Sequence, residues 1–355
     1  MSFNKKSPAQ SLLPFTYNCS NCPLKKQGYC EGIEDLRNYS MEHPSLIGCY
    51  DLERLEKYLS EVFDRLILPP NNFHQEKINL CELPFGVAYG NIDLTQYNNV
   101  PLFAVSMNIF LKDSGDFAFR DMAHLKKTLK IPTNAKVALI GTSSEKIQQA
   151  FWRVSERLKL LERIVEFNFE WVTSTTFPVW DENPRADQII HQFRNYLITD
   201  LMAEKGLPVI PFVYPYNESD YQTFSNWIKD RPSINKVAVL AQYYESDNQF
   251  LQLVTNIEKI QEYAEKELQF LIVGVTKKSK LEKALSKFKN ASIISWSPYY
   301  EAFLKGKMYD LNLKSEQRLD IDKSSVAFEN YKTFRQVLEQ IRKESNKQNY
   351  KFNQQ

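Results

Sequence analysis

The stretch LQFLIVGV, residues 268–275, is an almost uninterrupted run of apolar residues rich in Val, Ile and Leu. Further runs of the same kind are LPFGVAY from residue 83, PLFAVSMN from 101, KVALIGT from 136, FEWVTSTT from 169, LPVIPFVY from 207, KVAVLAQY from 236 and ASIISW from 291. Near-continuous hydrophobicity over so few residues is typical of parallel strands that are covered on both faces. The pattern therefore predicts a parallel sheet.

Amphipathic stretches separate these runs and indicate helices between the strands. Residues 144–164 place apolar side chains at helical spacing from Ile147 to Leu161, and a second stretch runs from Pro184 to Lys205 with Gly206 as its stop. Strands that alternate with helices over residues 83–310 predict an α/β protein built as a (β/α)8, TIM-like barrel. An open doubly wound sheet is the alternative, and the absence of a dinucleotide-binding fingerprint favours the barrel.

Two segments flank the predicted barrel. Residues 1–70 form a cysteine-rich segment that closes with a helix beginning at Asp51 and ends at Pro69-Pro70. Residues 311–355 begin with a polar stretch, continue into an amphipathic helix over Tyr331–Glu344, and end in a tail rich in Lys, Asn and Gln. We expect that tail to be disordered, because it has too few apolar residues to form a core.

Four cysteines in the first segment have the spacing of a metal site: Cys19, Cys22, Cys30 and Cys49. The Cys-x-x-Cys pair can place both sulfurs on one ion, and the two distant cysteines can complete an all-sulfur tetrahedral site. Zinc and an iron–sulfur cluster both accept four thiolates, so the sequence leaves these two cofactors open. The remaining cysteine, Cys81, is adjacent to the first strand and is expected to be a core residue.

The composition is that of an ordinary globular protein. Lys and Arg number 45 against 43 Asp and Glu in 355 residues, so the net charge of +2 does not by itself indicate a nucleic-acid partner. No stretch approaches the roughly 20 apolar residues of a membrane helix. The first residues lack the pattern of a signal peptide, which predicts a cytoplasmic protein. Neither common Gly-rich phosphate-binding motif occurs.

In a (β/α)8 barrel the reactive groups lie on the loops that follow the carboxyl ends of the strands. Hydroxyl, amide and aromatic side chains dominate these positions here, and such groups suit a polar ligand with several hydrogen-bonding atoms, such as a nucleobase, a sugar or an RNA end. The same Ser, Thr and Asn residues could instead cap the helices that follow. The predicted binding residues are Asn108, Ser143, Thr173, Arg194, Tyr214, Tyr216, Gln242, Tyr243, Lys277 and Trp296.

Catalytic residues are less evident. Asp113 and Asp116 could act as an acid–base pair, although Ser114 and Gly115 between them favour a turn, and Glu245 is a third carboxylate candidate. No histidine falls at the end of a predicted strand. His124 and His191 lie within predicted helices, where we expect partly exposed side chains without a catalytic role.

The segment QFRNY at residues 192–196, followed by KGLPVIP at 205–211, resembles an uncharacterised family of bacterial and phage proteins. Its members have a strand, a Gln-x-x-Asn-x-Tyr-Arg-like helix and a Gly-x-x-Val-Ile-Pro strand in succession. The resemblance covers residues 168–306 and implies a barrel similar to those of base-exchanging transglycosylases, whose paired aspartates and zinc ligands have no matching positions in this chain. The CxxCPL start of the cysteine cluster also resembles the cluster loop of some iron–sulfur uracil-DNA glycosylases.

Two functions are compatible with these patterns. The first is a metal-containing barrel that acts on or binds nucleic acid or nucleotides, in which Arg194 and Lys277 neutralise phosphate while the aromatic side chains stack on bases. The second is a non-catalytic subunit of a multi-protein assembly in a phage, mobile-element or defence context, which the small number of catalytic residue types favours. A membrane is not expected as a partner.

Overall fold

The structure, a computed structural model, describes Ser60 and residues 73–80, 83–89, 92–152, 154–177, 179, 185–214, 217–317 and 322–352. The strands are β1 (Phe85–Val87), β2 (Phe103–Ser106), β3 (Val137–Ile140), β4 (Val172–Thr173), β5 (Val209–Ile210), β6 (Lys236–Leu240), β7 (Gln269–Val273), β8 (Ser292–Ile294), β9 (Lys307–Tyr309) and β10 (Ser315–Gln317). The helices are the 3-10 helix η1 (Gln75–Lys77) and α3 (Met107–Phe110), α4 (Met122–Thr128), α5 (Glu145–Trp152), α6 (Val154–Phe167), α7 (Arg185–Glu204), α8 (Glu218–Lys229), α9 (Asp247–Ala264), α10 (Lys278–Lys287), α11 (Ser297–Lys305) and α12 (Lys323–Phe352).

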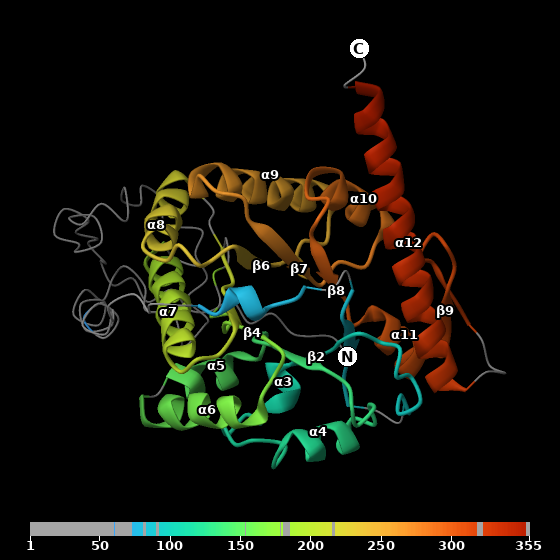
Figure 1. The fold of residues 1–355 in the computed structure, drawn as a ribbon, viewed down its shortest axis with the longest axis horizontal. Coiled ribbons are helices and arrows are strands. Elements are labelled where there is room, and N and C mark those ends of the chain that lie inside the picture. The colour runs from blue at the N-terminus through green and yellow to red at the C-terminus, as the bar shows by residue number, and fades with distance from the viewer. Residues whose placement is uncertain are drawn as a thin grey trace, which may run out of the picture.

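The first eight of these strands are parallel, and each lies within one of the apolar runs. Strands β1 to β5 form one sheet in sequential order, and β6 to β8 form a second. Helices lie around the strands on every side in Figure 1, with α9 and α10 above them, α7 and α8 to the left and α12 to the right. The prediction of an α/β fold with parallel strands and covering helices is confirmed.

The two sheets are joined to each other by single bridges. Phe212, just after β5, pairs in parallel with Ala238 of β6, and Phe85 of β1 pairs in parallel with Ser295 just after β8. The expected continuous eight-stranded ladder is therefore interrupted at two seams, between β5 and β6 and between β8 and β1. Pro208 and Pro211 flank β5, and neither has a backbone N–H to donate, which explains why the pairing there is short.

Alternate side chains along the strands contribute to two separate hydrophobic clusters, as the twofold repeat of a strand requires. The smaller cluster draws almost all its members from the strands and their ends, and both sheets contribute, with Ala104, Ile140, Ile210, Leu240, Leu271 and Ile294 among its residues. The larger cluster joins the opposite faces of the strands to the surrounding helices. The strands are thus buried on both faces.

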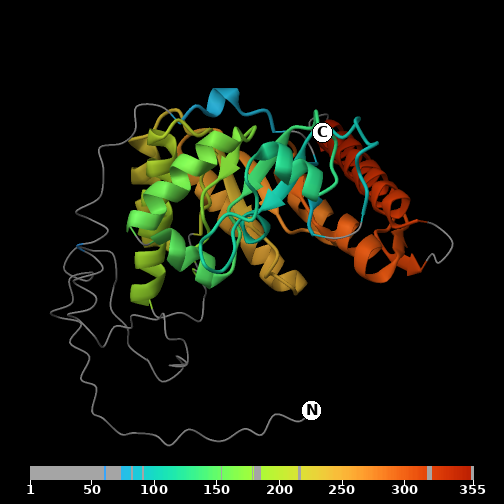
Figure 2. The ribbon, with the colours of Figure 1, turned by 90° about the horizontal axis from the view of Figure 1, so that it is seen from below.

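Gln75 of η1 spans the first seam at the amino ends of β5 and β6. Its Nε2 donates to the carbonyl oxygens of Val209 and Lys236, each at 3.0 Å. Its Oε1 accepts from the backbone N–H groups of Asn235 at 2.8 Å and Lys236 at 2.7 Å. The side chain is fully buried, so a single amide supplies hydrogen bonds that a longer ladder would otherwise make. Figure 2 shows η1 at the edge of the molecule, beyond the strands.

A buried ion pair joins the helices that flank the first seam. Asp200 of α7 accepts from Arg231, just after α8, at 2.7 Å and 2.6 Å in a two-point contact. The guanidinium also donates to the Trp227 carbonyl and lies 4.6 Å from the centre of its ring. Both charged groups are buried, so the pair links α7 to α8 where the backbone ladder is weakest.

Helix α12 covers the second seam. The Tyr331 hydroxyl donates to the Leu83 carbonyl at 3.1 Å, and its ring stacks on Phe85 with 4.8 Å between the ring centres. The preceding residue, Asn330, accepts from Tyr309 N–H and donates to the Pro298 carbonyl. One helix therefore contacts both β1 and the segments that follow β8.

Local signals account for the helix ends. Asn217 with Asp220 caps α8, Ser246 with Gln249 caps α9, and Gly206 follows α7 with a φ of 79°. One expectation needs correction: α12, which runs over Lys323–Phe352, is longer than the helix expected over residues 331–344. Within the described residues, no helix combines the length and the hydropathy that crossing a bilayer requires.

Candidate functional site

A cavity of about 760 Å³ lies at the carboxyl ends of the parallel strands. Segments that follow β2, β3, β4, β5, β6, β7 and β8 all contribute to its lining. Six of the predicted binding residues line it together: Asn108, Ser143, Tyr214, Gln242, Tyr243 and Trp296. Residues as much as 188 positions apart in the sequence thus share one cavity, because parallel strands bring their carboxyl ends to the same side of the fold.

Backbone contacts fix the segments that carry these side chains. Asn108 donates its N–H to the Thr142 carbonyl at 3.2 Å, and its Oδ1 accepts from Ser144 N–H at 3.1 Å. This pair of bonds ties the segment after β2 to the segment after β3. Asn108 and Ser144 both line the cavity. The predicted binding residue Asn108 therefore also holds a neighbouring lining segment in position.

Trp296 is positioned by a glycine in the neighbouring strand. A Cβ atom on Gly86 of β1 would lie 2.9 Å from Trp296 Cδ1 and 2.8 Å from the Ser295 carbonyl oxygen. Such distances are too short for a side chain, so the indole can occupy this place only because residue 86 is glycine. The same applies to Gly274, which has a φ of 97° and whose Cβ would lie 2.4 Å from Gln242 Cβ.

Gln148, Thr176 and Tyr214 form one polar wall of the cavity. Gln148 Nε2 donates to Thr176 Oγ1 at 3.2 Å and to the Ser143 carbonyl at 3.0 Å. Burial raises the pKa of Tyr214 well above its ordinary value, a shift that the neighbouring Thr176 hydroxyl opposes. The Tyr214 phenol is therefore a neutral hydrogen-bonding group throughout the physiological pH range.

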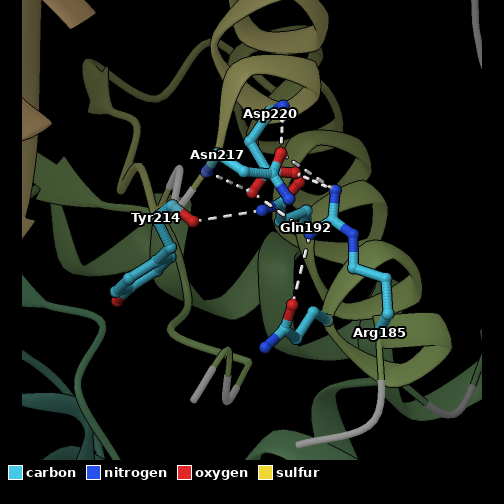
Figure 3. Close-up of polar contacts among 6 residues, drawn as sticks. Arg185, Gln192, Tyr214, Asn217 and Asp220 are labelled. Carbon is cyan, nitrogen blue, oxygen red and sulfur yellow. Dashed lines mark hydrogen bonds and ion pairs between the residues drawn. The ribbon is translucent and has the colours of Figure 1, made fainter. Parts of the chain in front are cut away.

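Side chains of α7 and of the start of α8 form a polar network behind Tyr214, and Gln192 of α7 contacts its backbone (Figure 3). Gln192 donates to the Tyr214 carbonyl at 3.0 Å. Arg185 donates to both carboxylate oxygens of Asp220, at 2.5 Å and 3.1 Å, and Asn217 and Asp220 cap α8 reciprocally. Figure 3 shows the Tyr214 ring pointing away from this network. The network therefore supports the cavity wall without taking part in the lining.

Three predicted binding residues do not line the cavity. Thr173 is fully buried, and its hydroxyl accepts from Gly141 N–H at 2.7 Å, which makes it part of the sheet. Lys277 is exposed at the residue before α10. Arg194 is only 2% exposed, and its guanidinium lies over the ring of Trp152, 4.4 Å from the centre. The expectation that Arg194 contacts a ligand phosphate is wrong, because an aromatic ring and the helix packing enclose its charge.

The predicted carboxylates also lie outside the lining. Asp113 is exposed and forms an ion pair with Lys146 at 3.5 Å, while Asp116 accepts from the Ser114 hydroxyl at 2.8 Å. The Lys112 N–H donates to the Asp116 carbonyl and Gly115 has a φ of 87°, as the turn interpretation predicts. Glu245 is exposed, and its backbone carbonyl accepts from Lys280.

His191, Gln148 and Phe177 line the cavity and were missed from the sequence. His191 lies on α7 and is 1% exposed, so the expectation of a partly exposed helix histidine is wrong. The reason is that α7 is buried around nearly its whole circumference, including its polar residues. The sequence of α7 mixes polar and apolar residues over its twenty positions, so its periodicity gives no signal that His191 is buried.

Several predictions fall on residues beyond the described ranges. Tyr216, Cys81 and the four predicted metal ligands, Cys19, Cys22, Cys30 and Cys49, are among them. Among the residues that the structure does describe, no group of three or more His, Cys, Asp or Glu side chains is arranged to hold a metal ion. The metal site therefore stays a prediction from cysteine spacing.

The described lining is nearly free of formal charge. It includes Glu145 and His191 but neither lysine nor arginine, and hydroxyl, amide and aromatic side chains make up most of the rest. Tyr243 and Tyr300 are 52% and 42% exposed at the edge of the cavity, so aromatic surface continues from the interior to the solvent. No protein-family model matches this chain, and no curated protein is significantly similar to it.

Proposed function

We propose that the cavity binds a nucleobase, carried either by a nucleoside or nucleotide or by an unstacked residue of a single-stranded nucleic acid. The observation that supports this most is the combination of aromatic rings with hydroxyl and amide groups and no cationic side chain in the described lining. Aromatic rings stack on bases, and amides and hydroxyls match the donors and acceptors along a base edge. A cavity of about 760 Å³ is within the usual size range for small-molecule sites.

Phosphate groups of such a ligand would stay at the mouth. A phosphate buried without a cation loses its hydration and gains no ion pair, so the neutral lining disfavours it inside. Lys146 and Lys277 are exposed and directly follow the lining residues Glu145 and Thr276, so we propose them as the cations that contact a phosphate from outside. The ligand would therefore enter with its base first.

Binding of nucleosides, measured by calorimetry and by the change in tryptophan fluorescence, tests this proposal. We expect Trp296→Leu and Tyr243→Ala to weaken binding about tenfold or more, since loss of base–aromatic stacking costs roughly 1–3 kcal/mol. Tyr89→Ala is the matched control for the second variant, because Tyr89 is similarly exposed, at 48%, but is not part of the lining. Binding of free sugars but of no nucleoside would refute the proposal.

Single-stranded RNA and DNA form the second arm of the test. If a base of a strand enters the cavity while the phosphates contact lysines outside, the affinity should fall with salt by a logarithmic slope of roughly 0.7 per phosphate contact. Nucleoside binding should show no such slope. If neither nucleosides nor single strands bind at low salt, the alternative function, a non-catalytic subunit of a protein assembly, is favoured.

Any reaction on the bound base would rely on few titratable groups. Among the described lining residues, Glu145 and His191 carry the carboxylate and imidazole groups that most often serve as general acids and bases. We propose these two as the acid–base candidates in place of Asp113, Asp116 and Glu245. Chromatography of nucleosides after long incubation with wild type, Glu145→Gln and His191→Gln would reveal turnover and assign it.

We also propose that the two sheets complete one closed (β/α)8 barrel. Three observations support this: the bridge of Phe212 to Ala238, the bridge of Phe85 to Ser295, and the smaller hydrophobic cluster, to which strands of both sheets contribute. A cavity lined from β2 round to β8 is also what a barrel mouth would provide. A crystal structure in which β1 and β8 lie apart would refute closure.

The proposed metal centre and cellular location complete this picture. Cys19, Cys22, Cys30 and Cys49 would hold zinc or an iron–sulfur cluster, on the basis of their spacing alone. Reduced thiolate ligands and a nucleobase ligand are both expected in the cytoplasm, where we place the protein. Similarity to base-exchanging barrels would be compatible with the proposed ligand.

A further inference from the structure

Two buried polar atoms lack a hydrogen-bond partner among the described residues: Ser143 Oγ in the connection from β3 to α5, and Gln148 Oε1 in α5 itself. Gln148 is 4% exposed and lines the cavity. Its Nε2 donates to the Ser143 carbonyl, which can only accept. The amide orientation is therefore fixed, and the oxygen is the end of Gln148 that lacks a partner.

Resting on the proposed function, we infer that Gln148 Oε1 reads the ligand by accepting a hydrogen bond from an amino group on its base. A buried amide oxygen without a partner is destabilising, and folded proteins rarely keep one unless a ligand or water satisfies it. Since a carboxamide oxygen can only accept, it favours a ligand with an N–H group at this place. The Ser143 hydroxyl can either donate or accept, so it matches a ring nitrogen next to that amino group.

This pair of atoms suits adenine, cytosine or the 2-amino edge of guanine. Each carries an exocyclic amino group beside a ring nitrogen that accepts. Uracil and hypoxanthine have a carbonyl oxygen at the position of the amino group, and this oxygen would face Gln148 Oε1 with no hydrogen between them. Gln148 of α5 and Ser143 just before that helix would therefore determine which base the cavity accepts, while the aromatic residues provide stacking for any base.

Two pairs of nucleosides that differ only in the amino group test the inference: adenosine with purine riboside, and cytidine with pyrimidin-2-one riboside. Wild type should bind the amino member of at least one pair about tenfold more tightly, the typical effect of one hydrogen bond to a buried group. In Gln148→Leu the two members should bind equally. Gln340→Leu is the matched control, since Gln340 is exposed on α12 and should leave the affinity and the ratio unchanged.

The ratio separates recognition from a structural defect. A variant that only loosens the wall lowers the affinity for both members and keeps their ratio, and that result would overturn the inference. Equal binding of both members to wild type would overturn it as well while leaving the proposed function standing. If no nucleoside binds to wild type, the proposed function and this inference both fail. Gln148→Met, which keeps an unbranched chain, replaces the leucine variant if circular dichroism shows that the latter is unfolded.

Discussion

Replacing Gln75 with alanine should destabilise the protein by about 3 kcal/mol. The side chain makes four hydrogen bonds across the first seam, between 2.7 and 3.0 Å long, and it is fully buried. At roughly 1 kcal/mol of net stability for each bond the loss would be about 4 kcal/mol. Lys236 is a partly exposed residue, so we expect water to replace part of the lost hydrogen bonding there. Urea unfolding, followed by far-ultraviolet circular dichroism, measures the difference.

Two further variants separate hydrogen bonding from packing. Gln75→Leu keeps most of the side-chain volume and removes every hydrogen bond, so we expect it to be as destabilising as the alanine variant. Gln340→Ala removes an exposed glutamine whose amide donates to the exposed Glu344, and it should change stability by less than about 0.5 kcal/mol. If Gln75→Ala costs no more than Gln340→Ala, the side chain does not bridge the seam and the reasoning is refuted.

Three other predictions follow from the structure. Gly86→Ala should displace the Trp296 indole, weaken nucleoside binding about tenfold and shift the tryptophan emission, because its Cβ would lie 2.9 Å from the ring; unchanged binding and emission would contradict this. Burial raises the pKa of Tyr299 and that of Tyr221 to about 12, whereas the pKa of an unfolded tyrosine is near 10. Between those values the unfolded chain has released protons that the folded chain keeps, so the free energy of unfolding should fall as the pH rises from about 10 to 12, and urea midpoints at pH 9 and 11 measure the change. The four N-terminal cysteines should hold about one metal centre per chain; elemental analysis and an absorbance scan after anaerobic purification distinguish zinc from iron–sulfur, and four freely titratable thiols in the folded protein would exclude both.

The strands and the place of the cavity were predictable from the sequence, because both depend on local patterns. Every apolar run contains a strand, and the residues that follow the runs gather at one side of the fold. Asn108, Gln242 and Trp296 were identified in this way without any knowledge of the pairing. Pro208 and Pro211 bracket β5 and signal weak pairing of this strand. Where two missing N–H donors would interrupt a ladder depends on the strand register, which the sequence does not contain.

Helix α7 shows what sequence patterns cannot supply. Arg194 was expected at a phosphate and His191 at the surface, yet both are buried. Their environment depends on contacts with segments far along the chain, as Asp200 depends on Arg231, thirty-one residues later. A polar residue in a helix has the same local sequence signal whether it faces solvent or a buried partner, so the burial of these residues could not be predicted from periodicity.

The seam between β5 and β6 divides the parallel strands into two groups. The strands before it and the strands after it are contiguous in sequence, and each group has its own ladder. Across the seam, side chains such as Gln75, Arg185 with Asp220, and Asp200 with Arg231 make many of the contacts. A cut in the connection from β5 to α8 would break neither ladder, and all of these contacts could form between two separate polypeptides. The protein is therefore suited to fragment complementation, in which two halves expressed apart reassociate into one cavity.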